Sequence, residues 1–179
     1  KETLEIIPKC ETDKILKEGD IFELNDRTDS IYWKIMETNG HCPGHICLAG
    51  EAGIVSGDNV AVIGTILVPS SDGDMNQYLD GLERMKNLNP PLLFPGHGPF
   101  SANPQRLLNR YIDHRSKRHQ AVYDAVKNNH FKLELIAKIA YQDTPDAHPI
   151  LLIDQTLSHL KGHIKSGKIK KINNEYFVK

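Results

Sequence analysis

The pattern of hydrophobic and polar positions divides the chain into a strand-rich first part and a helical last part. Apolar runs of strand length, rich in β-branched residues, occupy residues 31–36, 46–49 and 53–56. Residues 1–66 are therefore expected to form β-sheet. Turn residues between the runs predict turns at residues 17–20, 24–26, 39–40 and 49–51.

One amphipathic helix is predicted to follow these strands. Asp74 and Gln77 have the spacing of a capping box. Asn89-Pro90-Pro91 ends the helix, because proline cannot continue it, and residues 92–94 then predict a short buried strand. The hydrophobic positions of the helix recur every three or four residues and are Met75, Tyr78, Leu79, Leu82 and Met85.

The remaining residues predict three helices and a hairpin. The helices are expected over residues 103–128, 132–141 and 148–166, with Gly167 after the last of them and Ile153, Leu157, Leu160 and Ile164 on one face. Two strands, residues 168–172 and 175–178, flank the turn pair Asn173-Asn174. This order is typical of a winged-helix domain. We therefore predict two domains, residues 1–118 and 119–179, with the boundary inside the long helix at about residues 115–125.

Composition narrows the class of protein. The chain has 39% hydrophobic and 25% charged residues and a formal net charge of −1, so any affinity for a polyanion must come from a local patch. Cys10, Cys42 and Cys47 are odd in number and lack C-x-x-C spacing, which favours a reducing compartment, with the cytoplasm as the expected location. We expect a soluble chain, because no apolar run is long enough to cross a membrane and none resembles a signal peptide.

Three short segments place a possible metal ligand at a turn after an apolar strand. His41 follows Gly40, Asp58 follows Gly57, and His97 lies between two glycines. Glycine lets the backbone turn sharply, so that each side chain projects from the edge of the sheet. Two imidazoles and a carboxylate are ligands typical of zinc, although each segment taken alone is weak evidence.

These segments resemble metallo-β-lactamase-fold hydrolases such as glyoxalase II and the β-lactamase-like-protein-2 group. The resemblance rests on TNGHCPGHIC at residues 38–47, SGD at 56–58, GDMNQYLDGLER at 73–84 and PGHGP at 95–99. It implies the C-terminal part of an αββα sandwich with two zinc ions. In the family, the position of His41 ligates one metal, that of Asp58 bridges both and that of His97 ligates the second. His45 matches a histidine that is not normally a ligand, which implies a supporting or structural role.

The family's first metal motif, H-x-H-x-D-H, is absent from the 179 residues. We therefore expect a piece of a longer hydrolase that is inactive by itself, binds metal weakly and exposes apolar surface or an open sheet edge. Completion of the site by a second subunit in a homo-oligomer is an alternative. The general acid and the substrate contacts are not identified by the sequence.

Other metal-binding side chains have simpler interpretations. Cys42 lies beside His41, but a small buried thiol is the more economical interpretation than a ligand or nucleophile. His159 and His163 are four residues apart on one helix face, and a solvated face is favoured over a metal site.

A basic patch near the C-terminus suggests a partner. Residues 155–174 contain no Asp or Glu, and Arg106, Arg110, Arg115, Lys117 and Arg118 on the long helix could extend the surface. The patch predicts contact with nucleic acid, with RNA as the candidate, and packing against a protein domain is the alternative. Its lysines are Lys161, Lys165, Lys168, Lys170 and Lys171.

Three hypotheses for function follow. The first is a zinc-dependent hydrolase in which metal-activated water attacks an ester-like bond, with phosphodiesters favoured by the basic patch. The second is a binding module without catalytic activity, in which the winged helix contacts nucleic acid or protein. The third is hydrolysis of a thioester, as in glyoxalase II.

Overall fold

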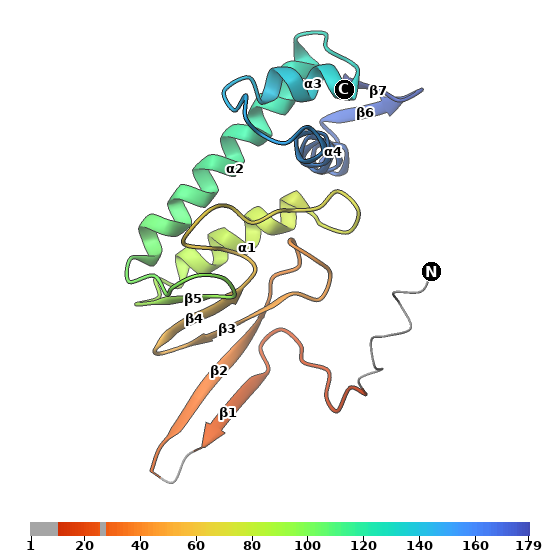
Figure 1. The fold of residues 1–179 in the computed structure, drawn as a ribbon. Coiled ribbons are helices and arrows are strands. Elements are labelled where there is room, and N and C mark those ends of the chain that lie inside the picture. The colour runs from red at the N-terminus through yellow and green to blue at the C-terminus, as the bar shows by residue number, and fades with distance from the viewer. Residues whose placement is uncertain (1–10, 26–27) are drawn as a thin grey trace, which may run out of the picture.

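Five strands form one sheet in the order β1-β2-β3-β4-β5, in which β1 to β4 pair antiparallel and β5 joins β4 in parallel (Figure 1). The structure is a computed structural model that describes residues 11–25 and 28–179, so Cys10 lies outside the described residues. The strands are β1 (Ile21–Asn25), β2 (Ser30–Glu37), β3 (Ile46–Gly50), β4 (Gly53–Gly57) and β5 (Leu93–Pro95). The remaining elements are α1 (Met75–Asn87), α2 (Pro104–Lys127), α3 (Leu133–Ala140), α4 (Pro149–Lys165), β6 (Ile169–Ile172) and β7 (Glu175–Val178).

The strands predicted over residues 31–36, 46–49, 53–56 and 92–94 and the predicted helices are confirmed in position. The expected sheet over residues 1–66 is correct only for β1 to β4, because residues 11–20 and 58–66 contain no strand, and residues 1–10 lie outside the described residues. The predicted turn at residues 24–26 is wrong for Leu24 and Asn25, which pair with Ile31 and Ser30 as the last residues of β1. Asparagine and aspartate favour turns, but here cross-strand pairing continues through Asn25.

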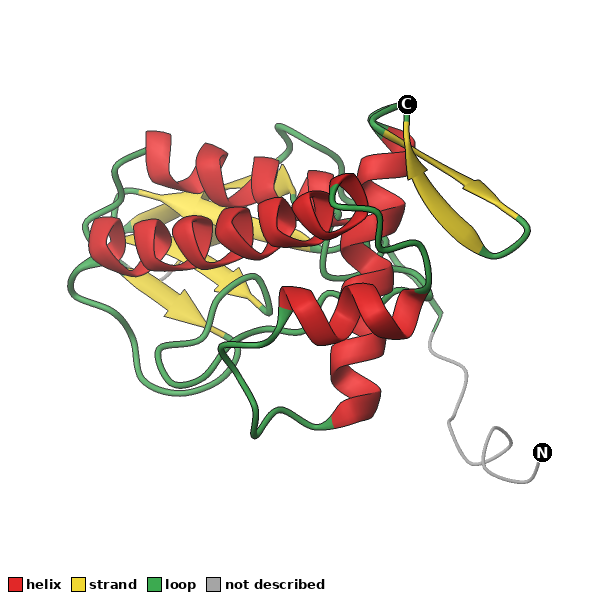
Figure 2. Ribbon diagram, turned by 90° about the horizontal axis from the view of Figure 1, so that it is seen from above, coloured by secondary structure: helices red, strands yellow, loops and turns green. Residues whose placement is uncertain are grey.

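Helix α1 begins where the capping residue predicts. The Asp74 carboxylate accepts hydrogen bonds from the backbone N–H groups of Asn76 and Gln77, which are otherwise unpaired at a helix start. Tyr78 and Leu82 on this helix are fully buried against the sheet. Helices α1 and α2 lie over the same face of the sheet (Figure 2).

The other face of the sheet carries exposed apolar side chains. Cross-strand neighbours share a face, so Phe22 and Trp33 lie on the face opposite to Met36, which belongs to the core under the helices. Leu24 and its partner Ile31 are 49% and 52% exposed on this side. The expectation of exposed apolar surface is thus confirmed.

The C-terminal helices and hairpin bury a second hydrophobic cluster. Helix α2 contributes Leu108 to the cluster under the sheet and Val122 to the second cluster, which also contains Leu160 of α4 and Tyr176 of β7. The long helix therefore joins the two parts, as Figure 1 shows. The division into residues 1–118 and 119–179 stays a prediction.

Two predictions about exposure on the helices are wrong. His159 and His163 are buried between α4 and α2, where the His119 and His163 rings stack with their centroids 3.6 Å apart. Arg115 and Arg118, which were expected on the surface, are also buried. Their guanidinium groups donate to backbone carbonyls, which offsets the cost of burying charge.

Helix α4 packs against the loop that precedes α1. The Lys161 ammonium donates to the Ser70 carbonyl at 2.6 Å, and Lys165 forms an ion pair with Asp74 at 2.6 Å. Two lysines of the predicted basic patch thus bind to groups within the chain.

No helix of the described residues is long and apolar enough to cross a lipid bilayer.

Candidate metal centre

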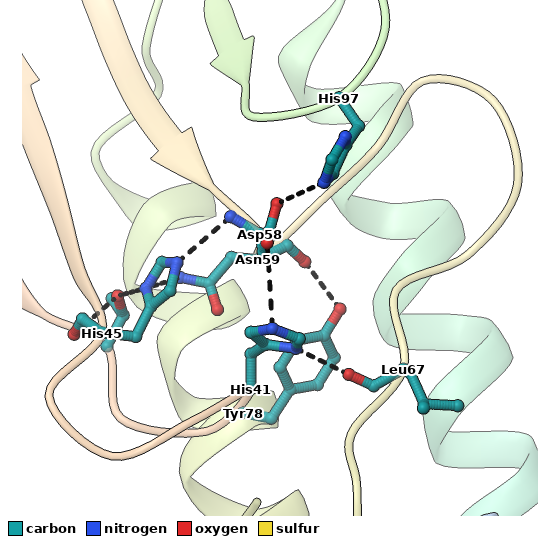
Figure 3. Close-up of polar contacts among 8 residues, drawn as sticks. His41, His45, Asp58, Asn59, Leu67, Tyr78 and His97 are labelled. Atoms are coloured by element: carbon teal, nitrogen blue, oxygen red, sulfur yellow. Dashed lines mark hydrogen bonds and ion pairs between the residues drawn. The ribbon is translucent and has the colours of Figure 1, made fainter. Parts of the chain in front are cut away.

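His41 is placed by the turn between β2 and β3. Gly40 lies so close to α1 that a Cβ atom there would be 2.4 Å from the Tyr78 Cα. The half-buried His41 ring places Nδ1 2.7 Å from the Leu67 carbonyl oxygen (Figure 3). Because a carbonyl only accepts, Nδ1 carries a proton in this contact, and Nε2 faces Asp58.

Asp58 follows β4 and requires two glycines around it. Gly57 has a φ of +49°, and a Cβ there would lie 2.8 Å from the His45 Nε2. A Cβ at Gly96 would lie 2.7 Å from the Asp58 Oδ1. Both positions leave no space for a larger residue, so the glycines that marked these segments in the sequence allow the close approach of the site's side chains.

His97 reaches the same carboxylate from the loop after β5. Its Nε2 lies 3.3 Å from the Asp58 Oδ1, whereas the His41 Nε2 lies 3.9 Å from the Asp58 Oδ2. The two imidazoles therefore approach different oxygens of one carboxylate (Figure 3). The His97 side chain is 75% exposed, so this side of the arrangement faces solvent.

His45 supports the backbone of Asp58. The Asp58 N–H donates to the His45 Nε2 at 3.1 Å, and the other ring nitrogen lies 2.9 Å from the Thr38 hydroxyl oxygen. Burial lowers the pKa of His45, and the neighbouring His41 lowers it further. His45 is therefore a neutral ring that uses both nitrogens for hydrogen bonds.

Three supporting groups were not predicted as part of the site. They are the Leu67 carbonyl, Tyr78, whose hydroxyl donates to the Asn59 carbonyl at 2.6 Å, and Asn59 itself, next to Asp58. Tyr78 was predicted only as a core residue. A backbone carbonyl has no signal in the sequence, and only the proximity of Asn59 to Asp58 could have indicated it.

Comparison with protein families matches the segment that contains these residues. Residues 11–97 match the sequence profile of the metallo-beta-lactamase superfamily. This segment contains His41, Asp58 and His97, which lie in the loops after β2, β4 and β5.

Curated relatives match most of this chain in sequence. A beta-lactamase-like protein 2 homolog of Drosophila melanogaster is 27% identical over 84% of this chain and 53% of its own length. An atrochrysone carboxyl ACP thioesterase of Aspergillus fumigatus is 29% identical over 62% of this chain and 33% of its own length. The chain spans about half the length of the first of these relatives.

The fold is also that of solved metallo-beta-lactamase structures. A beta-lactamase domain protein from Burkholderia ambifaria superposes with a TM-score of 0.72, at 22% identity, over 93% of this chain and 52% of its own. A metallo-beta-lactamase family protein from Thermus thermophilus superposes with a TM-score of 0.71, at 17% identity, over 92% of this chain and 54% of its own. The likeness in fold to these two structures therefore extends past residue 97. A winged-helix domain is not part of that finding.

The donors present fit part of a metal site. The His41 Nδ1 is bound to a backbone carbonyl, as in most metal-binding histidines, and Nε2 is directed toward Asp58. In residues 11–25 and 28–179, however, no group of three or more His, Cys, Asp or Glu side chains is arranged to hold one ion. Cys42 is half-buried and belongs to no such group among these residues.

Proposed function

We propose that this chain carries one half of the dinuclear zinc centre of a hydrolase. The observation that supports this is the convergence of the His41 and His97 Nε2 atoms on different oxygens of Asp58. One ion would take His41 and the other His97, with the carboxylate shared between them. Two ions with one imidazole each are short of the three or four protein ligands of ordinary zinc sites.

The roles of the chain's own residues follow from their hydrogen bonds. The Leu67 carbonyl holds His41 with Nε2 free, and His45 holds the backbone of Asp58. Zinc bound there would supply Lewis-acid chemistry and a water that is nucleophilic at neutral pH. Because H-x-H-x-D-H is absent from the sequence, the remaining ligands must come from another polypeptide segment or a second subunit. We propose that the chain by itself does not turn over substrate.

A zinc titration tests the metal role. Purified protein stripped with a chelator is titrated with zinc in competition with a chromogenic indicator. We expect weak binding that Asp58→Asn, His41→Ala or His97→Ala each weakens at least about tenfold, since even the partners of metal ligands have effects of that size.

The control for this titration is His148→Ala, because His148 is exposed and far along the chain at the start of α4. Its zinc affinity should equal that of the unchanged protein. If Asp58→Asn also left the affinity unchanged, these residues would not be zinc ligands, and the proposal would be wrong.

We propose a phosphodiester as the substrate class. The basis is the set of exposed lysines at the C-terminal hairpin, which could hold a polyanionic chain. A thioester is the second candidate, because one relative is named as a thioesterase of an acyl carrier protein. Fold alone does not decide between these classes.

We also propose a cytoplasmic location, since Cys42 and Cys47 are both free thiols.

We propose that the C-terminal part is a winged-helix domain and that it binds nucleic acid. Helix α3, helix α4 and the β6–β7 hairpin follow the end of α2 in the order of that motif, and Asn173 and Asn174 form the hairpin turn with positive φ. Lys168, Lys170 and Lys171 are exposed, whereas Lys161 and Lys165 bind within the chain. The hairpin, rather than α4, is therefore the proposed contact surface.

Binding of a fluorescent single-stranded RNA, followed by anisotropy at several salt concentrations, tests this contact. Three phosphate contacts predict a slope of log K against log salt of about −2. The variant with Lys168→Ala, Lys170→Ala and Lys171→Ala should lose binding and most of this slope. A control with Lys14→Ala, Lys17→Ala and Lys34→Ala removes equal charge from exposed positions of the first part and should still bind. Equal loss in both variants would mean that only net charge matters.

A further inference from the structure

The backbone segment 66–68 connects the metal centre to helix α4. The Gln155 side chain of α4 binds both polar groups of Val68, with Nε2 donating to the Val68 carbonyl at 2.9 Å and Oε1 accepting from the Val68 N–H at 3.4 Å. Gln155 and Val68 are both buried. Gln155 and Val68 are 87 residues apart in sequence, so they are in contact only because α4 packs on the loop before α1.

The bond to the Val68 N–H also orients the Leu67 carbonyl. The Leu67 C=O and the Val68 N–H belong to one peptide unit, which is planar and trans, so the two groups point in opposite directions. Gln155 holds one end of this unit, and the His41 Nδ1 binds the other end at 2.7 Å. The angle at which the carbonyl faces His41 therefore depends on Gln155.

Arg115 of α2 sets the orientation of the Gln155 amide. Its Nη1 donates to the Gln155 Oε1 at 3.1 Å, and its Nη2 donates to the Ile66 carbonyl. A charged donor on Oε1 prevents the amide from turning over, because that would place the Nε2 hydrogens against the guanidinium. The amide oxygen thus stays on the Val68 N–H.

We propose that Gln155 is a positioning residue for His41. Through the Leu67–Val68 peptide it keeps a proton on the His41 Nδ1 and keeps Nε2 directed toward Asp58. The C-terminal helical part then belongs to the metal centre rather than being an appended module. The effect on zinc rests on the proposed function, whereas the effect on the proton position of His41 does not.

The proton position is measured by long-range proton–nitrogen NMR of the histidine side chains in metal-free protein. The measurement is made at about pH 8, where an ordinary imidazole is neutral. We expect the Nδ1–H form of His41 in the unchanged protein. In Gln155→Leu, the Val68 N–H loses its hydrogen-bond acceptor. His41 should then become a mixture of the Nδ1–H and Nε2–H forms. Zinc affinity should fall about tenfold.

The matched control is Lys161→Met, which removes another contact between α4 and the same loop without touching Gln155. His41 should keep its Nδ1–H form in this variant. An unchanged His41 spectrum in folded Gln155→Leu would overturn the inference. An Nε2–H form of His41 in the unchanged protein would overturn it as well, and this holds even if Gln155→Leu does not fold. If His41 shifts as expected but Asp58→Asn binds zinc as well as the unchanged protein, the inference stands and the proposed function fails.

Discussion

Replacing Gly40 by alanine is expected to lower the free energy of unfolding by about 3 kcal/mol, as for other additions of atoms to a closely packed interior. A Cβ at this position would lie 2.4 Å from the Tyr78 Cα and 2.5 Å from the Tyr78 backbone nitrogen. Backbone atoms in a helix cannot move aside as the end of a flexible side chain can. The Gly40 carbonyl also accepts from the Asp74 N–H, so the start of α1 must move together with the turn. Urea unfolding followed by circular dichroism measures the change.

The control for this substitution is Gly44→Ala. Gly44 has a φ of +76° and no atom within 4 Å of the position that a Cβ would take, so alanine there meets only the conformational cost of the left-handed region, about 1 kcal/mol. Both glycines flank His41 within a short loop, but only one touches α1. Equal losses in the two variants would contradict the packing explanation.

The protein is expected to lose stability between about pH 6.5 and about pH 4 because of a buried histidine cluster. The His119 Nδ1 lies 3.1 Å from the His159 Nδ1, and His163 stacks on His119. Burial lowers the pKa of His119 to about 4 and that of His159 well below its usual value. Positive neighbours, among them Arg115 and Lys168, lower these pKa values further.

The sign follows from the folded and unfolded pKa values. An unfolded histidine takes up a proton near pH 6.5, whereas the folded cluster resists it, so the unfolded state binds more protons as the pH falls. Stability is therefore fully present above about pH 6.5 and is lost toward about pH 4. For His119 alone the loss between about pH 7 and about pH 4.5 is about 2 kcal/mol.

Urea unfolding at both pH values tests this, with a variant carrying His119→Gln and His159→Gln. The variant can be less stable at neutral pH, but its stability should depend less on pH than that of the unchanged protein. His148→Gln removes an exposed histidine and should retain the full pH dependence. Identical pH dependence in all three proteins would show that the cluster does not control acid stability.

Local signals in the sequence determined the elements and the candidate ligands. Asp74 marked the start of α1, Asn173-Asn174 marked the hairpin turn, and glycines beside His41, Asp58 and His97 marked the three loops of the site. These signals act over a few residues, because capping, turn geometry and alternation depend on neighbours along the chain. Secondary structure and the candidate site could therefore be predicted without tertiary contacts.

Only the tertiary structure decided which polar side chains are buried and what they hold. Arg115, His159 and Gln155 have the helical spacing of surface residues, yet they are buried where α2, α4 and the loop before α1 meet. The carbonyl of Leu67, which orients His41, has no side-chain signal at all. Burial depends on which segments come together from distant parts of the chain, and the periodicity of a single helix contains no information about its partner.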